Sequence, residues 1–172
     1  MNEVRILAAT GMLGSGFLEK SFFNGVSLKP HVIACDSGST DAGPAHLGGN
    51  IPYFSREAIK RDFRLMLLGR EISQAKLIIG SCGMGGGDWA VDWMKDIAFE
   101  IAKEENLKFK LALIKSEQDK GFLKSCLKND KITSLYPHFE INEEDIETSS
   151  HIVGVMGCEP IIEALNNNAE VI

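Results

Sequence analysis

The chain has 172 residues, of which 44% are hydrophobic, and a formal net charge of −6. This length suits a single globular domain with a hydrophobic core and is short for two domains. The negative charge disfavours binding to nucleic acid or to an anionic membrane, and no segment has the roughly 18 consecutive apolar residues of a membrane helix. Four cysteines without a CxxC pair, and an N-terminus unlike a secretory signal, predict a cytoplasmic protein.

Short apolar runs recur along the chain, as expected of strands that are buried on both faces. The five runs are Val4–Ala9, Val32–Cys35, Leu77–Ile79, Leu111–Ile114 and Ile152–Met156. Ala169–Ile172 resembles the opening of a sixth strand that stops almost as it starts. This unfinished unit suggests a truncated domain or one half of a larger one.

Amphipathic stretches separate these runs. The two longest, Ser55–Ile72 and Asp88–Glu105, have one apolar face each, as helices that cover a sheet do. Shorter helices are predicted at Ser15–Asn24, Gly121–Lys128, Glu143–Thr148 and Pro160–Asn166, with Asn142 as the cap of the third. Alternating strands and helices predict one α/β domain over residues 1–172, a three-layer Rossmann-like fold with a mainly parallel sheet of about five or six strands.

The loops that follow the predicted strands form the candidate site, because ligands of open parallel sheets bind beyond the carboxyl ends of the strands. The first loop contains Gly11, Gly14 and Gly16, and Asp36 ends the second strand, which resembles a dinucleotide-binding pattern. The spacing departs from G-x-G-x-x-G, so NAD is the less favoured cofactor. The same glycines could simply let the first helix pack close to its strand.

The second loop, ACDSGSTDAGP, is long and rich in small polar residues. Long ordered loops at the carboxyl end of a strand are often functional, although Asx and Ser/Thr turns would use the same residues. We expect a ligand-facing surface with Asp36, Gly38, Ser39 and Thr40 as binding groups and Asp41 as a catalytic group.

The third loop is glycine-rich and precedes a predicted helix, so its backbone N–H groups could hold a phosphate or carboxylate. Its candidate binding residues are Gly80, Ser81, Gly83 and Gly85. No G-K-[ST] follows, which excludes a P-loop. Asp88 is both the predicted cap of the helix and a candidate catalytic carboxylate, and Asp92 would share its helical face. Cys82 is more typical of packing than of nucleophilic catalysis.

The fourth loop places Glu117 and Asp119 beside Lys120, and either carboxylate is a candidate general base. Asp119 could equally cap a helix. Cys158, at the start of the last helix, is a weaker candidate nucleophile. The histidines and cysteines lack zinc-site spacing, so no metal site is assigned, but a divalent cation held by Asp36, Asp41 and Asp88 stays open.

Several segments resemble the N-terminal region of the longer proteins of the acyclic terpene utilisation family. They are VRILAATGMLGSGF, DSGSTDAGP with the following FSREAIKRDFRLML, LIIGSCGMGGGDWAVDW, KFKLALIKSEQDK and MGCEPIIEAL, and they span nearly the whole chain. The resemblance implies a role in the catabolism of branched or isoprenoid carboxylic acids, as the acids or their coenzyme A thioesters.

The same resemblance marks a set of motif positions. They are Gly11, Asp36, Gly38, Ser39, Thr40, Asp41, Gly43, Pro44, Ser55, Arg56, Lys60, Arg61, Gly80, Ser81, Gly83, Gly87, Asp92, Glu117 and Asp119. Arg56 and Lys60 lie one turn apart at the start of a predicted helix and could clamp a substrate carboxylate, with a solvated helix face as the alternative.

The sequence therefore predicts an enzyme domain of the lyase, hydratase or isomerase type, acting on a small branched acid or its thioester. Asp41, Asp88, Glu117 and Asp119 are its candidate catalytic residues. One alternative is a NAD-dependent oxidoreductase. Another is a non-catalytic binding or assembly subunit, as a homo-oligomer or with a partner subunit, because an unfinished sheet edge could pair with another chain.

Overall fold

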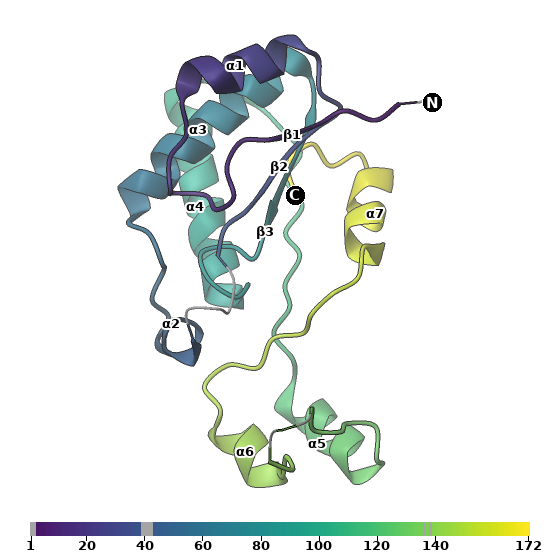
Figure 1. The fold of residues 1–172 in the computed structure, drawn as a ribbon. Coiled ribbons are helices and arrows are strands. Elements are labelled where there is room, and N and C mark those ends of the chain that lie inside the picture. Colours follow the sequence, from purple (N-terminus) through teal and green to yellow (C-terminus); the bar gives the residue numbers. More distant parts are fainter. Residues whose placement is uncertain (1–2, 39–42, 136, 138) are drawn as a thin grey trace.

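The computed structural model describes residues 3–38, 43–135, 137 and 139–172. Three parallel strands form its sheet: β1 (Ile6–Ala8), β2 (Val32–Asp36) and β3 (Lys76–Gly80), in the order β1-β2-β3. Seven helices are assigned within these residues: α1 (Glu19–Ser27), α2 (Pro44–Gly49), α3 (Arg56–Ser73), α4 (Asp88–Glu104), α5 (Lys120–Lys128), α6 (Glu143–Thr148) and α7 (Glu159–Asn166) (Figure 1).

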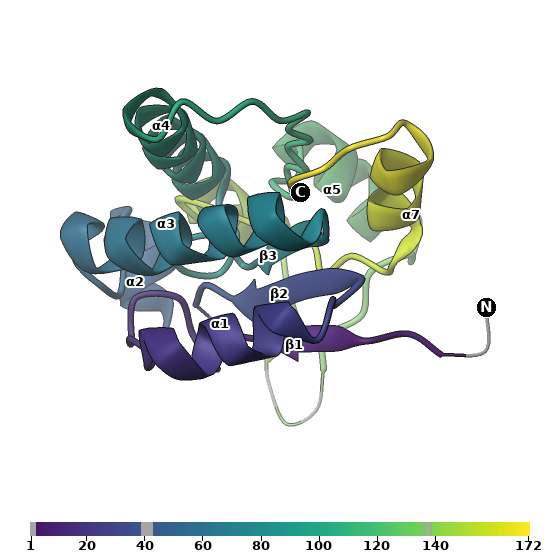
Figure 2. The ribbon, with the colours of Figure 1, turned by 90° about the horizontal axis from the view of Figure 1, so that it is seen from above.

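One face of the sheet carries the core. Leu7, Ile33 and Leu77 are partners in register across the three strands, so their side chains share a face. Helices α1, α3 and α4 lie along that face (Figure 2). Helices α1 and α3 pack closely because they meet at a glycine: a Cβ on Gly69 of α3 would lie 2.6 Å from the Phe22 ring of α1. The buried core also includes Ile59, Phe63, Met66, Leu67, Met94, Ile97, Ile101 and Val171.

The opposite face of the sheet is much less covered. Ile6 of β1 is 66% exposed, and among the described helices only α7 lies on that side (Figures 1 and 2). The prediction of strands buried on both faces is therefore wrong for β1. Over β1 and β2 the structure has two layers, the sheet and the helices α1, α3 and α4, in place of the predicted three (Figure 2).

The predicted sheet of five or six strands, in a three-layer Rossmann-like fold, is also wrong: the described structure is a small α/β domain with a three-stranded sheet. Outside this sheet, the described residues form isolated bridges only: Val171 with Leu77 and with Leu111, and Glu117 with Val153. An apolar run indicates burial, but a strand also needs a neighbour in register over several residues. Around residues 111, 153 and 171 the pairing stays limited to isolated bridges, so no further strand is assigned there.

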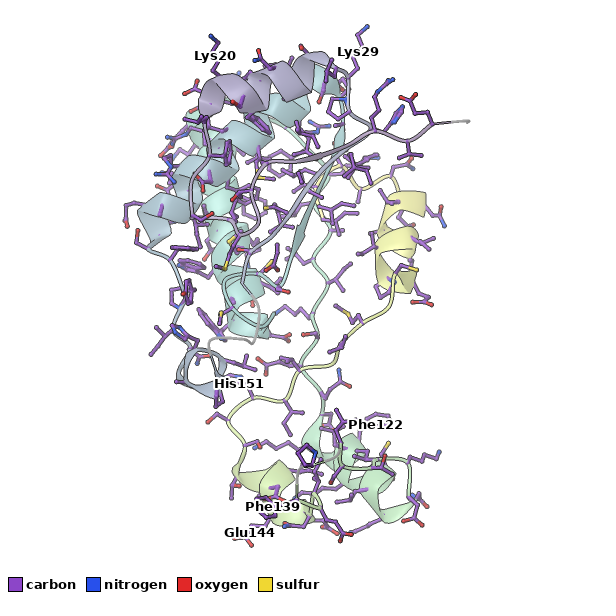
Figure 3. The ribbon with its side chains drawn as sticks, in the orientation of Figure 1. Lys20, Lys29, Phe122, Phe139, Glu144 and His151 are labelled. Carbon is purple, nitrogen blue, oxygen red and sulfur yellow. The ribbon has the colours of Figure 1, made fainter. Side chains whose placement is uncertain are left out.

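Helices α5 and α6 form an extension, residues 118–152, that projects from the body (Figure 1). The labelled side chains Phe122 and Phe139 lie at this end of the molecule, and Lys20 and Lys29 lie at the opposite end (Figure 3). Phe139 is 97% exposed. The extension therefore lies outside the hydrophobic core of the body.

Side-chain caps explain several helix starts. Ser55 accepts a hydrogen bond from the N–H of Ala58, Asp119 accepts one from Phe122, and Asn142 forms a capping box with Asp145. Helix α1 begins later than predicted, at Glu19. Within the described part of the chain, no helix combines the length and the apolar character needed to cross a bilayer.

Candidate functional site

The first glycine loop is organised by a buried carboxylate. Asp62 of α3 is fully buried, and its Oδ2 accepts hydrogen bonds from the N–H groups of Gly14 and Gly16, each at 2.9 Å. Its Oδ1 is paired with Arg61 at 2.7 Å. Gly11 is exposed and lies outside this network.

The N–H groups that donate to Asp62 are those that would face a bound dinucleotide in this kind of loop. In dinucleotide-binding folds, the backbone N–H groups of the glycine loop face the pyrophosphate. Here Gly14 and Gly16 donate to Asp62, a negative group supplied by the chain itself. The Asp62 carboxylate of α3 therefore occupies the N–H groups of Gly14 and Gly16.

The loops after β2 and β3 are in direct contact. A Cβ on Gly38 would lie 3.0 Å from the carbonyl oxygen of Gly83, and Gly38 has a φ of +125°, so only glycine fits there without strain. Gly85 N–H donates to the Gly38 carbonyl at 3.3 Å, and Gly83 N–H donates to Ser37 Oγ at 3.3 Å. The two predicted binding loops therefore form one continuous surface.

The middle of the polar loop cannot be placed. Ser39, Thr40 and Asp41 lie outside the described residues. Asp36 is half-buried, its carboxylate accepts from Gly38 N–H at 3.3 Å, and its Oδ1 lies 3.9 Å from the Cβ position of Gly80. Asp36 therefore lies beside the start of the loop formed by residues 80–87.

Asp88 and Glu117 are brought together across the site. Asp88 is the first residue of α4, and Gly87 is its cap, so the predicted capping role of Asp88 is wrong. The Asp88 carboxylate instead accepts from the N–H groups of Ser116 and Glu117, both at 3.2 Å. The Glu117 carboxylate accepts from Asp88 N–H at 3.0 Å.

Glu117 has a second partner that the sequence analysis missed. His151 Nδ1 lies 2.9 Å from Glu117 Oε1, and both side chains are largely buried, at 16% and 27% exposure. The antiparallel bridge between Glu117 and Val153 places His151 there. No local motif indicates this pair, because the two residues are 34 positions apart.

Asp92 does share the helical face of Asp88, as its spacing predicts. It pairs with Lys115 at 2.7 Å and with Lys95 at 3.1 Å. The hydrogen bond from Lys115, followed by that from Lys95, lowers the pKa of Asp92, and the same contact raises the pKa of Lys115. Asp92 therefore serves as the anchor of two surface cations.

Two other predicted site residues have partners within the fold. Asp119 is the cap of α5, with Phe122 N–H donating to its carboxylate at 2.7 Å. Arg56 lies 2.5 Å from Glu100 of α4. Glu100 is about 18 Å along the helix axis from Asp88, given the rise per residue of an α-helix. Arg56 thus bridges α3 and α4 at a distance from the 80–87 loop.

The cysteines of the two central loops are poor nucleophiles. Burial, followed by the charge of Asp36, raises the pKa of the Cys35 thiol to about 12. Burial raises the pKa of Cys82 to about 11. Thiolate is the reactive form, so neither residue is activated at neutral pH. Cys158 is exposed.

A cavity of about 400 Å³ adjoins the site. Gly80, Ser81, Gly86 and Ser116 line it, and Ser116 Oγ donates to the Gly86 carbonyl at 2.9 Å. Most of its remaining lining is aliphatic and comes from α4, residues 111–114, residues 153–157 and α7. Ser116 links this cavity to the polar cluster, because its N–H donates to Asp88 at 3.2 Å.

Among the described residues, no three His, Cys, Asp or Glu side chains gather in a way that could hold a metal ion. The cation site that the sequence leaves open at Asp36, Asp41 and Asp88 lies partly outside those residues, because it includes Asp41. Comparison with known families, curated proteins and solved structures finds no match to this chain.

Proposed function

We propose that this chain is a cytoplasmic enzyme domain that moves a proton on a small branched or isoprenoid carboxylic acid, or on its coenzyme A thioester. The observation that carries the proposal is the 2.9 Å contact between His151 Nδ1 and Glu117 Oε1. A carboxylate at Nδ1 orients the ring and leaves Nε2 to give or take a proton. Such a step is common to lyases, hydratases and isomerases.

The surroundings of the pair support an acyl substrate. The N–H groups of Ser81 and Gly86 have no hydrogen-bond partner among the described residues and lie near the start of α4, where a carboxylate or thioester oxygen is favoured. Val155 and Met156, which follow His151 on the same segment, are exposed and offer apolar contacts to a branched chain. We place the substrate at this mouth of the cavity.

The other residues of the candidate site have supporting roles in this proposal. Asp88 holds the N–H groups of Ser116 and Glu117 and so positions the Glu117 carboxylate. Asp36 and Gly38 belong to the neighbouring wall of the site. Asp41, outside the described residues, remains a candidate catalytic residue. Arg56 and Asp119 are left out of the proposed chemistry because of their partners in the fold.

Solvent exchange tests this function without knowledge of the full reaction. The protein is incubated in D2O with 3-methylbutanoate, 3-methylbut-2-enoate and their coenzyme A thioesters, and deuterium incorporation is followed by NMR. We expect exchange with at least one compound, and Glu117→Gln or His151→Gln should slow it about 100-fold or more.

Glu147→Gln is the matched control, because Glu147 is an exposed glutamate of the same extension that pairs with Lys124. Its exchange rate should equal that of the unmodified protein. Absence of exchange with every compound, or equal rates in the Glu117→Gln and Glu147→Gln variants, would contradict the proposal.

A binding or assembly subunit is the second candidate function. It is favoured by the N–H groups of Ser81 and Gly86, which could also bind a ligand without any reaction. The NAD-dependent alternative lacks comparable support, because Asp62 engages the N–H groups of Gly14 and Gly16.

A further inference from the structure

Ser116 is a buried polar residue, with 6% of its surface exposed. Its backbone N–H donates to Asp88 Oδ1 at 3.2 Å, and its backbone carbonyl accepts from Gly154 N–H at 2.8 Å. Its hydroxyl donates to the Gly86 carbonyl at 2.9 Å. Each polar group of Ser116 is therefore hydrogen-bonded within the fold, as burial requires.

These three contacts join different segments of the chain. Asp88 starts α4, Gly154 lies at the base of the extension, and Gly86 belongs to the loop of residues 80–87. Any residue at position 116 could make the first two contacts, because they use the backbone. Only the contact with Gly86 requires a hydroxyl. This contact connects the glycine loop to the residue next to Glu117, the carboxylate of the proposed catalytic pair.

Gly86 lies in the part of the loop that has the greatest freedom of rotation. Residues 85–87 are three consecutive glycines, and Gly85 and Gly86 have φ values of +63° and +72°. A glycine loses more conformational entropy on ordering than any other residue. In the described part of the chain, the Ser116 hydroxyl is the one hydrogen-bond partner of the Gly86 carbonyl. The hydroxyl therefore restricts a backbone that few other contacts hold.

Two contacts flank the Gly86 N–H group along the chain. Gly85 N–H donates to the Gly38 carbonyl at 3.3 Å on one side, and Ser116 holds the Gly86 carbonyl on the other. The Gly86 N–H between them has no hydrogen-bond partner among the described residues, and the proposed function gives it the substrate oxygen. A donor that stabilises developing charge is effective only if it is already fixed before the reaction.

We infer that Ser116 is a positioning residue for an acyl thioester substrate, an inference that rests on the proposed function. Its hydroxyl fixes the Gly86 backbone relative to Glu117, so that the Gly86 N–H and the Glu117–His151 pair act on one acyl group. His151 Nε2 takes the α-proton, and the electron pair of the C–H bond forms the carbon–carbon double bond of the enolate. The π pair of the carbonyl moves onto the thioester oxygen, to which Gly86 N–H donates.

The charges around Ser116 favour a thioester over a free acid. The carboxylates of Asp88 and Glu117 lie beside it, and the ammonium group of Lys115 is paired with Asp92 at 2.7 Å. A substrate carboxylate would add a negative charge, and loss of its α-proton would make a dianion. The acyl group of a thioester is neutral and gains one negative charge during the reaction, which an N–H donor can stabilise.

Steady-state exchange kinetics test the role of the hydroxyl. The probe is the coenzyme A thioester of 3-methylbutanoate in D2O, with deuterium incorporation followed by NMR. We expect Ser116→Ala to lower kcat about tenfold or more and to change KM by less than about twofold, because the donor acts in the transition state. Ser116→Thr keeps the hydroxyl and should restore kcat to within about threefold of the unmodified protein.

Ser73→Ala is the matched control, because Ser73 Oγ donates to the carbonyl of another glycine, Gly69, at 2.8 Å near the end of α3. It loses the same kind of hydrogen bond and should keep its kcat. NMR relaxation gives a reading that needs no turnover. Ser116→Ala should lower the order parameters of the Gly86 and Gly87 amides to about 0.6 or less, and Ser73→Ala should leave them unchanged.

The outcomes separate this inference from the proposed function. If the unmodified protein catalyses exchange, an unchanged kcat or unchanged order parameters in Ser116→Ala overturn the role of Ser116 alone. A loss of kcat that Ser116→Thr does not restore has the same meaning. Exchange of 3-methylbutanoate as fast as that of its thioester overturns the substrate class. Absence of exchange with the unmodified protein overturns the proposed function and this inference together.

Discussion

Asp88 and Glu117 each bind the backbone of the other. Asp88 N–H donates to Glu117 Oε1 at 3.0 Å, and Glu117 N–H donates to Asp88 Oδ1 at 3.2 Å. This reciprocal pair ties the first residue of α4 to the segment that follows residues 111–114. It also holds Glu117 where His151 can reach it.

Replacement of Asp88 by alanine tests this link. We expect Asp88→Ala to lower the free energy of unfolding by about 1–3 kcal/mol, because the N–H groups of Ser116 and Glu117 lose their acceptor. Urea denaturation measures the change. Asp92→Ala is the control, since Asp92 lies one turn along the same face and pairs only with Lys95 and Lys115 at the surface. Equal losses in the two variants would contradict the reciprocal arrangement.

The buried Asp62 should matter more than any exposed helix aspartate. Asp62→Ala leaves the N–H groups of Gly14 and Gly16 without an acceptor, which we expect to cost about 2–4 kcal/mol. Asp96→Ala is the matched control on α4, because the Asp96 side chain is 69% exposed. Thermal and urea unfolding should separate the two variants clearly. If NAD raises the melting temperature of the unmodified protein, the closed-loop interpretation is wrong.

Gly38 tests the contact between the two central loops. Gly38→Ala puts a Cβ 3.0 Å from the Gly83 carbonyl oxygen at a φ of +125°, and we expect a loss of about 2 kcal/mol or more. Gly48→Ala is the control: Gly48 lies in α2 and a Cβ there meets nothing within 4 Å. That variant should be neutral or slightly more stable. A tolerated alanine at position 38 would show that the loops do not touch.

The ion pairs between α3 and α4 should make stability depend on pH. Hydrogen bonds from Lys60, and then Arg56, lower the pKa of Glu100 from 4.5 to about 2. The folded protein therefore binds this proton less readily than the unfolded chain, so the stabilisation is present above pH 4.5 and is lost as the pH falls towards 2.

Melting temperatures of Glu100→Gln across this range provide the measurement. The variant should melt below the unmodified protein at neutral pH, and the difference should shrink between pH 4.5 and 2 and with added salt. Glu57→Gln, in the first turn of α3, is the control and should show no such convergence. A constant difference at all pH values would contradict the assignment.

Helices were largely predictable because their determinants are local. The capping residues Ser55 and Asn142 and the apolar periodicity of residues 56–73 and 88–104 depend on spacing within one segment. Helix α2 was missed, since Pro44–Gly49 has too little apolar periodicity to stand out within a polar loop.

The size of the sheet was not predictable, because pairing depends on residues far apart in the chain. Leu111 and Val153 occur in runs that look like strands, yet each makes a single bridge. Two key residues of the site depend on similar long-range contacts. His151 reaches Glu117 only through the Glu117–Val153 bridge, whereas Asp62 had a local indication that was overlooked, a charged residue on the apolar stripe of α3.

The extension of residues 118–152 leaves and rejoins the body at neighbouring points. Gln118 N–H donates to the Ile152 carbonyl, and Gly154 N–H donates to the Ser116 carbonyl, both at 2.8 Å. This segment is therefore an insertion whose two ends are hydrogen-bonded to each other, so its length can change without altering the path of any strand. Positions near its tip are therefore suitable for a fluorophore or an affinity tag, provided that the graft stops short of His151.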